Sequence, residues 1–190
     1  MKNRFSIGCR GQSTIEFAFM ALFLLPLLAL GVFEFGRAIQ AKNIVINMSR
    51  EGTNLVRRSS DDPQNIMNAL ANTAQPLDMA RYGMFYITEV KGMSSGQIEV
   101  VTQYKWLSAT VSPLPPSKVP VSSCTPGPHD PPGVCTPSST LNANLTALHL
   151  TSGALADGQI AYVTEVFYHY PVIFRNIINY SPQIYSITIF

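Results

Sequence analysis

An unbroken apolar run near the start of the chain is the feature that most limits its fold. Residues 17–33 read FAFMALFLLPLLALGVF and carry no charge. A helix that spans a membrane needs roughly 20 apolar residues, and about 17 is the lower limit. Ile15 and Phe35 extend the run to that length if Glu16 and Glu34 lie near the two interfaces. Because buried core helices are rarely apolar on every face, the run predicts a transmembrane helix rather than a core helix.

Basic residues do not orient this helix. Three precede the run and three follow it: Lys2, Arg4 and Arg10, then Arg37, Lys42 and Arg50. Because the two counts are equal, the positive-inside rule gives no direction. The 16-residue lead is short enough to stay in the cytoplasm. We therefore expect the remainder of the chain after the run to be exported.

Glu16 is a carboxylate at the edge of the apolar run. A charged carboxylate costs about 2.5–3.5 kcal/mol at the centre of a bilayer and less near its edge, and such residues are candidates for function. The alternative is a side chain that only reaches out to the lipid headgroups. Position alone does not decide between these two interpretations.

The residues around Glu16 carry a recognisable pattern. From Arg10 to Phe17 the chain reads RGQSTIEF. This stretch resembles the processing site of type IV pilin-like proteins, in which a short basic leader ends in Gly and a prepilin peptidase cuts after it. The resemblance implies Gly11 as the last leader residue, Gln12 as the new N-terminus and Glu16 as the fifth mature residue.

Two further patches resemble a narrower family. The Glu16-Phe17 pair and residues 31–37 (GVFEFGR) look like the TadE-like proteins of the tight-adherence (Tad/Flp) pilus system. Residues 158–171 (GQIAYVTEVFYHYP) are similar to the C-terminal strand of that family. The resemblance covers roughly residues 8–58 and 155–190 and leaves the middle uncovered. The final residues, ITIF, lack the Arg-rich tail common in relatives, which puts a role for such a tail in doubt.

The resemblance implies a structural or assembly role without enzymatic activity or cofactors. Cleavage would create a positive amino group at Gln12, one helical turn from Glu16, and pairing of the two charges would lower the cost of desolvating each. Glu16, followed by Phe17, would then set the register between neighbouring helices in lipid. The implied partners are membrane lipid, the prepilin peptidase and other pilin-like or Tad secretion proteins, with no nucleic acid and no small-molecule substrate.

One alternative to pilin-type processing remains open. A secretory signal peptide also has a basic start and an apolar core, and Ala29-Leu30-Gly31 could serve as its small-residue cleavage site. The exported part would then be a secreted or membrane-anchored domain with an unrecognised enzymatic or ligand-binding role. The N-terminus of the mature protein separates these possibilities.

Periodicity predicts an α+β fold for the rest of the chain. The first helix should continue to about Arg58 with an amphipathic stripe that packs on the chain's own sheet; the stripe is Phe35, Ala38, Ile39, Ile46, Ser49 and Val56. Asp62 and Pro63 are typical of a new helix start, which predicts a helix over 63–75. Alternation of apolar and polar residues predicts four strands, at 84–90, 97–106, 159–170 and 183–190. The spacing of Leu141, Leu145 and Leu148 predicts a brief helix over 141–150.

These elements give three regions. Residues 1–11 form the prepilin-type leader, 12–35 the transmembrane helix, and 36–190 a periplasmic TadE-like domain. The fold class is α+β: a single N-terminal transmembrane helix that continues into an amphipathic helix, packed on a small antiparallel sheet. The expected location is the bacterial inner membrane, as a single-pass protein.

A Pro-rich loop interrupts the exported region at 113–137. It holds nine prolines, so it cannot be a helix or a central strand. Cys124 and Cys135 lie within it, and in an oxidising compartment they can form a disulfide, the alternative being two free thiols. A Cys₂His metal site with His129 is conceivable, but spacing supplies no fourth ligand, so no metal is predicted.

Signatures of catalysis and of nucleotide binding are absent from the sequence. The chain has no G-x-G-x-x-G, P-loop or H-E-x-x-H motif. Residues 92–96 (GMSSG) have the G-x-S-x-G spacing, but they lie between two predicted strands and not at the strand-to-helix turn that this nucleophile motif needs. Glu89 and Glu165 could face each other across a sheet, but we expect both on a solvated face. The formal net charge of +2 is too small for an electrostatic nucleic-acid binder, and the 46% hydrophobic content excludes a wholly disordered chain.

Overall fold

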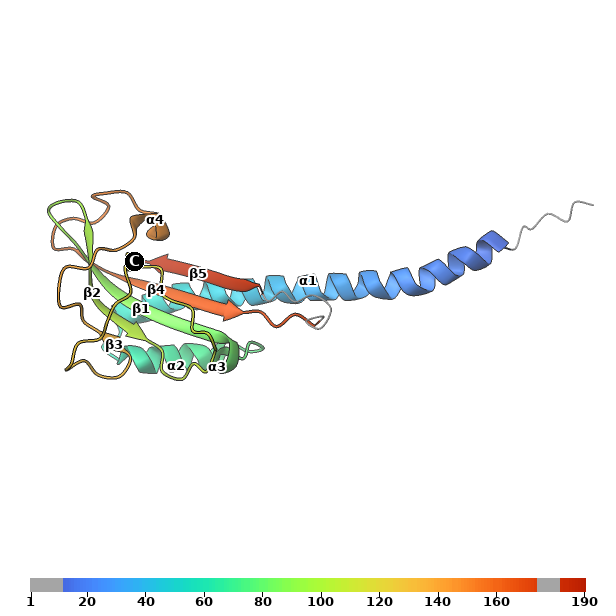
Figure 1. Cartoon of the computed structure of the whole chain (residues 1–190), viewed down its shortest axis with the longest axis horizontal. Coiled ribbons are helices and arrows are strands. Elements are labelled where there is room, and N and C mark those ends of the chain that lie inside the picture. Colours follow the sequence, from blue (N-terminus) through green and yellow to red (C-terminus); the bar gives the residue numbers. More distant parts are fainter. Residues whose placement is uncertain (1–11, 174–181) are drawn as a thin grey trace, which may run out of the picture. The chain divides into compact units, whose positions relative to one another are not determined.

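The structure, a computed structural model, describes residues 12–173 and 182–190 (Figure 1). The chain divides into two compact units, and the boundary falls between Ile39 and Gln40. Helix α1, Gln12–Arg58, begins in the first unit and ends in the second. Its end at Arg58 confirms the predicted length of the first helix.

The described part of the first unit is the N-terminal part of α1. Its large apolar side chains are exposed, from Ile15 to Phe35. The helix runs through Pro26, whose missing N–H removes one backbone hydrogen bond. Apolar residues on every face with no protein around them are what a lipid environment selects.

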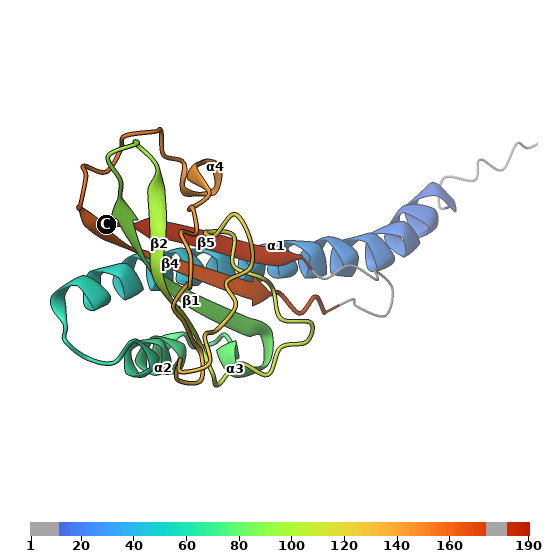
Figure 2. The same cartoon turned by 60° about the vertical axis from the view of Figure 1, so that its left-hand side comes forward.

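The second unit is built on an antiparallel sheet with strand order β3-β2-β1-β4-β5 (Figure 2). The strands are β1 (Gly83–Gly92), β2 (Ile98–Lys105), β3 (Val134–Cys135), β4 (Ile160–His169) and β5 (Gln183–Ile189). Strands β1 and β4 occupy the centre, and β1 pairs with both β2 and β4. The predicted α+β class, with a helix packed on a small antiparallel sheet, is confirmed.

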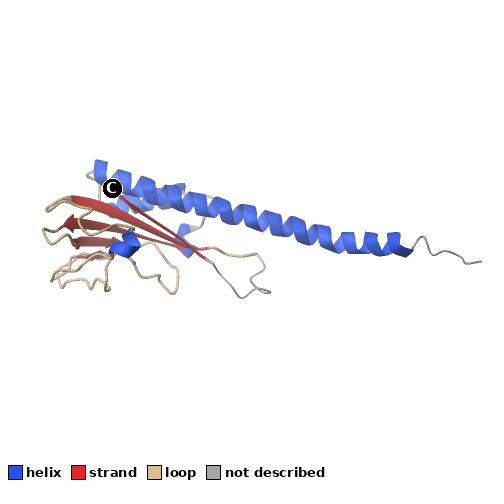
Figure 3. Cartoon of the chain, turned by 90° about the horizontal axis from the view of Figure 1, so that it is seen from above, coloured by secondary structure: helices blue, strands red, loops and turns tan. Residues whose placement is uncertain are grey.

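Helices cover one face of this sheet (Figure 3). The C-terminal half of α1 buries a stripe with helical spacing against it: Ala41, Val45, Met48, Ser49, Gly52 and Thr53. The Ser49 hydroxyl lies 2.8 Å from the Ser186 hydroxyl and 2.9 Å from that of Thr188, which ties the helix to β5. The expected stripe was right at Ser49 and wrong at Phe35 and Ile39, which are 68% and 45% exposed.

Helix α2 (Pro63–Thr73) lies on the same face and has the predicted start. The Asp62 side chain accepts a hydrogen bond from the Gln64 N–H, and Pro63 occupies the first turn, where its missing N–H costs nothing. Ile66, Met67 and Leu70 are buried, as the spacing indicates.

The other face of the sheet is covered by irregular chain and by the short helix α4 (Leu145–Leu148). An apolar cluster fills the space beneath it, built from Val90, Ile98, Val100, Val119, Ala143, Leu148, Ala161 and Val163. Val119 comes from the Pro-rich loop, hereafter the Pro-rich segment (residues 113–137). That segment is therefore part of the folded core and not a free linker.

Two short helices differ from the sequence prediction. Helix α3 (Met79–Tyr82), capped by the Asp78 side chain, was not predicted. Helix α4 (Leu145–Leu148) is shorter than the expected 141–150. The residues before it are held extended by isolated bridges, in which Asn142 pairs with Glu99 and Ala143 with Pro120.

Candidate functional site

The N-terminal half of α1 carries the residues that the sequence marks for processing and assembly. Gly11 lies outside the described residues, and Gln12 is the first residue of α1. Glu16 and Phe17 follow on the same helix, and both are exposed. Residues four apart lie on one helical face, so Glu16 stands above Gln12, one turn along.

Helix α1 is long and apolar enough to cross a membrane, judged by length and composition. None of its most apolar 18-residue window is buried inside the protein. This distinguishes the helix from the core helix of a soluble protein, which would be mostly buried. A membrane anchor is what this arrangement indicates.

A charged pair marks the other end of the apolar run. Arg37 Nη1 lies 3.4 Å from Glu34 Oε2, one turn earlier on the helix. The Arg37 guanidinium also lies 6.0 Å from the centre of the Phe33 ring. An arginine and an aromatic ring side by side are typical of a helix that leaves the hydrocarbon core.

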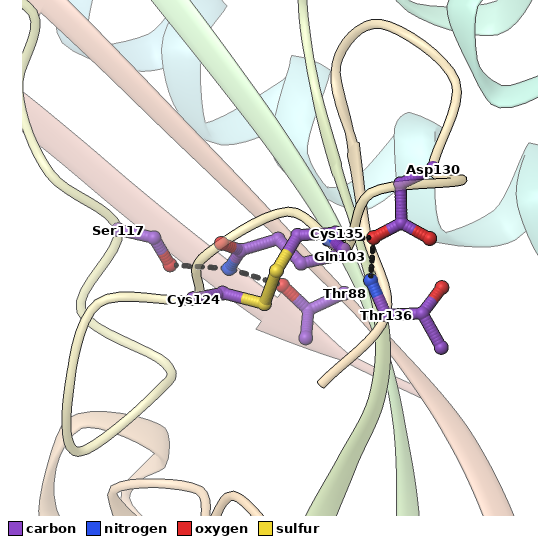
Figure 4. The surroundings of a disulfide bond; sticks show 8 residues. Thr88, Gln103, Ser117, Cys124, Asp130, Cys135 and Thr136 are labelled. Carbon is purple, nitrogen blue, oxygen red and sulfur yellow. Dashed lines mark hydrogen bonds between the residues drawn. A yellow bond between two sulfur atoms is a disulfide. The ribbon is translucent and has the colours of Figure 1, made fainter. Parts of the chain in front are cut away.

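The structure joins Cys124 to Cys135 in a disulfide within the Pro-rich segment (Figure 4). The two Cα atoms lie 6.1 Å apart, inside the usual range for this bond. Cys135 belongs to β3 and pairs with Gln103 of β2. The disulfide thus attaches the irregular chain at Cys124 to the edge of the sheet.

Asp130 organises the loop between the two cysteines. Its Oδ2 accepts hydrogen bonds from the backbone N–H of Gly127 at 2.7 Å and of Thr136 at 2.8 Å. The bond from Thr136, drawn in Figure 4, and that from Gly127 lower the pKa of the Asp130 carboxyl, because they stabilise its charged form. The Asp130 carboxylate is therefore used to hold the loop together through Gly127 and Thr136, and not as a metal ligand beside His129.

The cysteines do not contribute thiolates to a metal site while they are bonded to each other. Within residues 12–173 and 182–190, no group of three or more His, Cys, Asp or Glu side chains could hold a metal ion.

The most unusual polar group of the second unit is Glu165, in central strand β4. Its side chain is fully buried. The carboxylate accepts hydrogen bonds from the Ser117 hydroxyl, from the Lys118 backbone N–H at 2.9 Å and from the Tyr185 hydroxyl at 2.9 Å. Ser117 and Lys118 belong to the Pro-rich segment, so this carboxylate joins that segment to the sheet.

The polar contacts continue from Ser117 across the sheet. Gln103 Nε2 donates to the Ser117 hydroxyl at 2.9 Å and to the Thr88 hydroxyl at 3.1 Å, as Figure 4 shows. A chain of hydrogen bonds therefore runs from Tyr185 on β5 to Thr88 on β1. We call these five residues the Glu165 cluster: Thr88, Gln103, Ser117, Glu165 and Tyr185.

Burial is the largest cause of the pKa shifts in and around this cluster. Desolvation raises the pKa of Glu165, and its hydrogen bonds from Ser117, Lys118 and Tyr185 offset part of that rise. Burial and the nearby Glu165 charge raise the pKa of Tyr86 to about 12, and the same causes raise the pKa of Tyr185. Both tyrosines are therefore neutral donors at physiological pH.

A cavity of about 370 Å³ lies between the Pro-rich segment and the sheet. Its wall includes Tyr86, Gln103, Ser117 and the disulfide. The Ser117 hydroxyl donates to Glu165 and accepts from Gln103 and from the Val119 N–H, so it is fixed on several sides. This arrangement holds the Pro-rich segment in place against the sheet.

Sequence reasoning was wrong about Glu165, which it placed on a solvated face. Glu165 lies opposite Tyr86, and Glu89 lies opposite Tyr162, so the two carboxylates are not cross-strand partners. The available signal was the apolar neighbourhood of Glu165, between Val163 and Val166-Phe167. That signal is weak because Glu89 also has apolar neighbours and is only half-buried.

Comparison with known proteins agrees with the N-terminal geometry. Residues 11–54 match the family model described as TadE-like protein. No curated protein and no solved structure matches the chain. The matched residues begin at Gly11 and include Glu16, Phe17 and the whole apolar run, whereas residues 155–190 lie outside the match. TadE-like proteins are components of pilus assembly, which links the chain to the Tad pilus. The resemblance seen in the sequence is thus confirmed for residues 11–54, which are similar to TadE-like proteins.

Proposed function

We propose that the chain is a pseudopilin-like structural or assembly component of a Tad/Flp pilus system. The observation that carries this proposal is the TadE-like match over residues 11–54, which coincides with an exposed apolar helix. In this role residues 12–35 anchor the protein in the bacterial inner membrane, and residues 36–190 form its periplasmic domain. The protein acts by association and not by catalysis.

Maturation by a prepilin peptidase is the first step of the proposed function. The peptidase cuts between Gly11 and Gln12 on the cytoplasmic side. The removed residues carry three positive charges and no negative ones, so the formal net charge falls from +2 to −1. The product begins at the first residue of α1, where the new amino group stands one turn below Glu16.

Glu16 then acts in helix association within lipid. A carboxylate near the edge of the hydrocarbon core is stabilised by an amino group, and the amino group of a neighbouring chain serves as well as its own. Helices that align these two charges are favoured over helices shifted along their axes. Phe17, also exposed, contributes apolar contact at the same level of the helix.

The periplasmic location fits the disulfide. Bonds such as Cys124–Cys135 form and persist in the bacterial periplasm and are rare in the cytosol. The second unit, with its sheet and its Pro-rich segment, presents the surface that contacts other pilus or secretion proteins.

The test is the mass and N-terminal sequence of the protein purified from its native membrane. A chain that begins at Gln12 supports the proposal. A start near Val32 supports simple secretion, and an intact Met1 supports a plain membrane anchor; either result overturns pilin-type processing. Replacing Gly11 by leucine should accumulate the uncut precursor. The matched control is Gly8→Leu, a change at another glycine of the leader, which should leave processing intact.

A further inference from the structure

The Pro-rich segment has few ways to attach itself to the sheet. Nine of its 25 residues are prolines, which have no N–H to donate. Its regular pairing is limited to the two-residue strand β3 and the bridge between Pro120 and Ala143. A segment of this kind needs side-chain contacts to hold it, and it has them in two separate places.

The first attachment is Glu165. Two of the three donors to its carboxylate, the Ser117 hydroxyl and the Lys118 N–H, are consecutive residues of the Pro-rich segment. The Tyr86 hydroxyl, on the neighbouring strand β1, donates to the Pro115 carbonyl at 2.8 Å. The part of the segment from 115 to 118 is therefore bound to side chains that project from β1 and β4.

The second attachment is the disulfide. Cys135 is fixed in β3, and the adjacent Gly133 carbonyl accepts a hydrogen bond from the Lys105 N–H at 2.6 Å. The bond to Cys124 then ties down the chain that follows the first attachment. Between the two attachments Val119 is fully buried in the apolar cluster.

We propose that the Pro-rich segment is a detachable cover over one face of the sheet, closed by two independent attachments: the buried carboxylate of Glu165 and the Cys124–Cys135 bond. Release of one attachment leaves the other in place, so the cover opens rarely. Release of both leaves the segment held only by its bridge at Pro120 and by the burial of Val119, so the apolar cluster around Val90, Val100 and Val163 is exposed far more often. The reducing or oxidising state of the compartment thus sets how firmly this face is closed.

Lys118 provides a direct readout of opening. It is exposed, but the next residue, Val119, is buried, so trypsin can cut after Lys118 only when the segment lifts from the sheet. The experiment compares trypsin cleavage after Lys118 in the full chain in detergent micelles, with the disulfide intact and after reduction. The variants are Glu165→Ala and Ser117→Ala, the second of which removes a donor from the segment and leaves the strands unchanged.

Each single release should raise the rate of cleavage after Lys118 about tenfold, and the two together about a hundredfold. A product of the single effects is the signature of independent attachments. Cleavage after Lys91, near the end of strand β1, serves as the internal reference for general unfolding. The matched controls are Glu89→Ala, a half-buried carboxylate on the neighbouring strand, and Ser123→Ala, an exposed serine in the same segment.

Equal cleavage after Lys118 in wild type and in both variants, oxidised and reduced, would overturn the proposal. If Glu165→Ala accelerates cleavage at every site, the protein has unfolded and Ser117→Ala decides. Faster cleavage after Lys118 alone in that variant supports the cover, and an unchanged rate overturns it. A double release no faster than the larger single release overturns the independence of the two attachments.

Discussion

Glu165 is a glutamate in the middle of a sheet, where either its protonated or its charged form must be stabilised. Burial raises its pKa, and the hydrogen bonds that it accepts lower it. Burial is the larger cause. The folded protein therefore holds a proton on Glu165 over a pH range in which the unfolded chain has released it. Below about pH 4.5, the ordinary value for glutamate, both states are protonated. Above it, stability falls as the pH rises, until the folded-state pKa is passed.

Glu165→Gln should remove this loss because glutamine does not titrate. We expect wild type to lose stability relative to Glu165→Gln as the pH rises above 4.5, with a slope of at most about 1.4 kcal/mol per pH unit. Trp106, the single tryptophan, is buried in the second unit and reports urea unfolding by its fluorescence. The nearby charged and titratable groups, Tyr86, Tyr185 and Lys118, are present in both proteins. Wild type gaining stability over the variant as the pH rises would show that the three hydrogen bonds outweigh burial.

Thr164, one residue earlier on β4, carries a buried hydroxyl that has no hydrogen-bond partner among the described residues. Valine has the same shape without the polar group, so Thr164→Val should raise the unfolding free energy by about 1 kcal/mol. Thr88 on β1 is the matched control, because its hydroxyl accepts from Gln103. Thr88→Val should lower the unfolding free energy by about 1–3 kcal/mol, since it leaves a buried donor unpaired. Both are measured by urea titration, and a destabilised Thr164→Val would contradict the assignment.

These two strands show what a sequence can and cannot say about single residues. Residues 87–90 (ITEV) and 163–166 (VTEV) are nearly the same, yet Glu165 is buried and Glu89 is half-buried. The difference comes from the Pro-rich segment, which crosses β4 at Glu165 and lies 47 residues away in sequence at Lys118. Local pattern carries no information about such a contact. The roles assigned to Gly11, Gln12 and Glu16 rest on a signal contained within a few neighbouring positions, and they stay predictions.

At the scale of elements, helix α1 meets the sheet at Gly52. A Cβ atom at this position would lie 3.0 Å from Thr164 Cγ2 and 3.1 Å from Leu70 Cδ1. Alanine favours a helix over glycine by about 1 kcal/mol, but overpacking a core costs about 1–3 kcal/mol, and Thr164 is fixed in a central strand. Gly52→Ala should therefore lower the unfolding free energy by about 1 kcal/mol, followed by Trp106 fluorescence. Gly36→Ala, which meets nothing within 4 Å, gains the helix preference of alanine without the overpacking cost and should not lower the unfolding free energy. A stabilised Gly52→Ala would mean that α1 and the sheet can move apart without cost.

Elements with local signals could be predicted, and those set by distant contacts could not. The start of α2 depends on Asp62 and Pro63, and strands β1 and β2 depend on the alternation of residues 84–90 and 97–106, so these elements were found. The shortening of α4 depends on pairing of Asn142 with Glu99, far along the chain, and was missed. The buried stripe of α1 was placed too early because apolar residues facing lipid and those facing a sheet look alike in sequence.

In the whole molecule, the two units give apolar and acidic residues different surroundings. In the second unit, a core of apolar side chains is buried and Glu165 is stabilised by protein donors. In the first unit, apolar side chains from Ile15 to Phe35 are exposed, and only lipid or another helix can cover them. Glu16 and Glu34 lie at opposite ends of this apolar surface, so they form a natural pair for comparison.

Our last prediction concerns this pair and depends on the proposed function. Glu34 has an ion-pair partner on its own helix, Arg37, at 3.4 Å, whereas Glu16 is proposed to meet the amino group at Gln12 of its own or a neighbouring chain. Glu16→Gln should therefore insert normally but lose at least tenfold in crosslinking to other pilin-like proteins in intact cells. Glu34→Gln, the same change at the other end of the span, should keep crosslinking near the wild-type level. An equal loss in both variants would show that the apolar surface needs charge at its ends in general; an unchanged Glu16→Gln would show that helix register is set by packing alone.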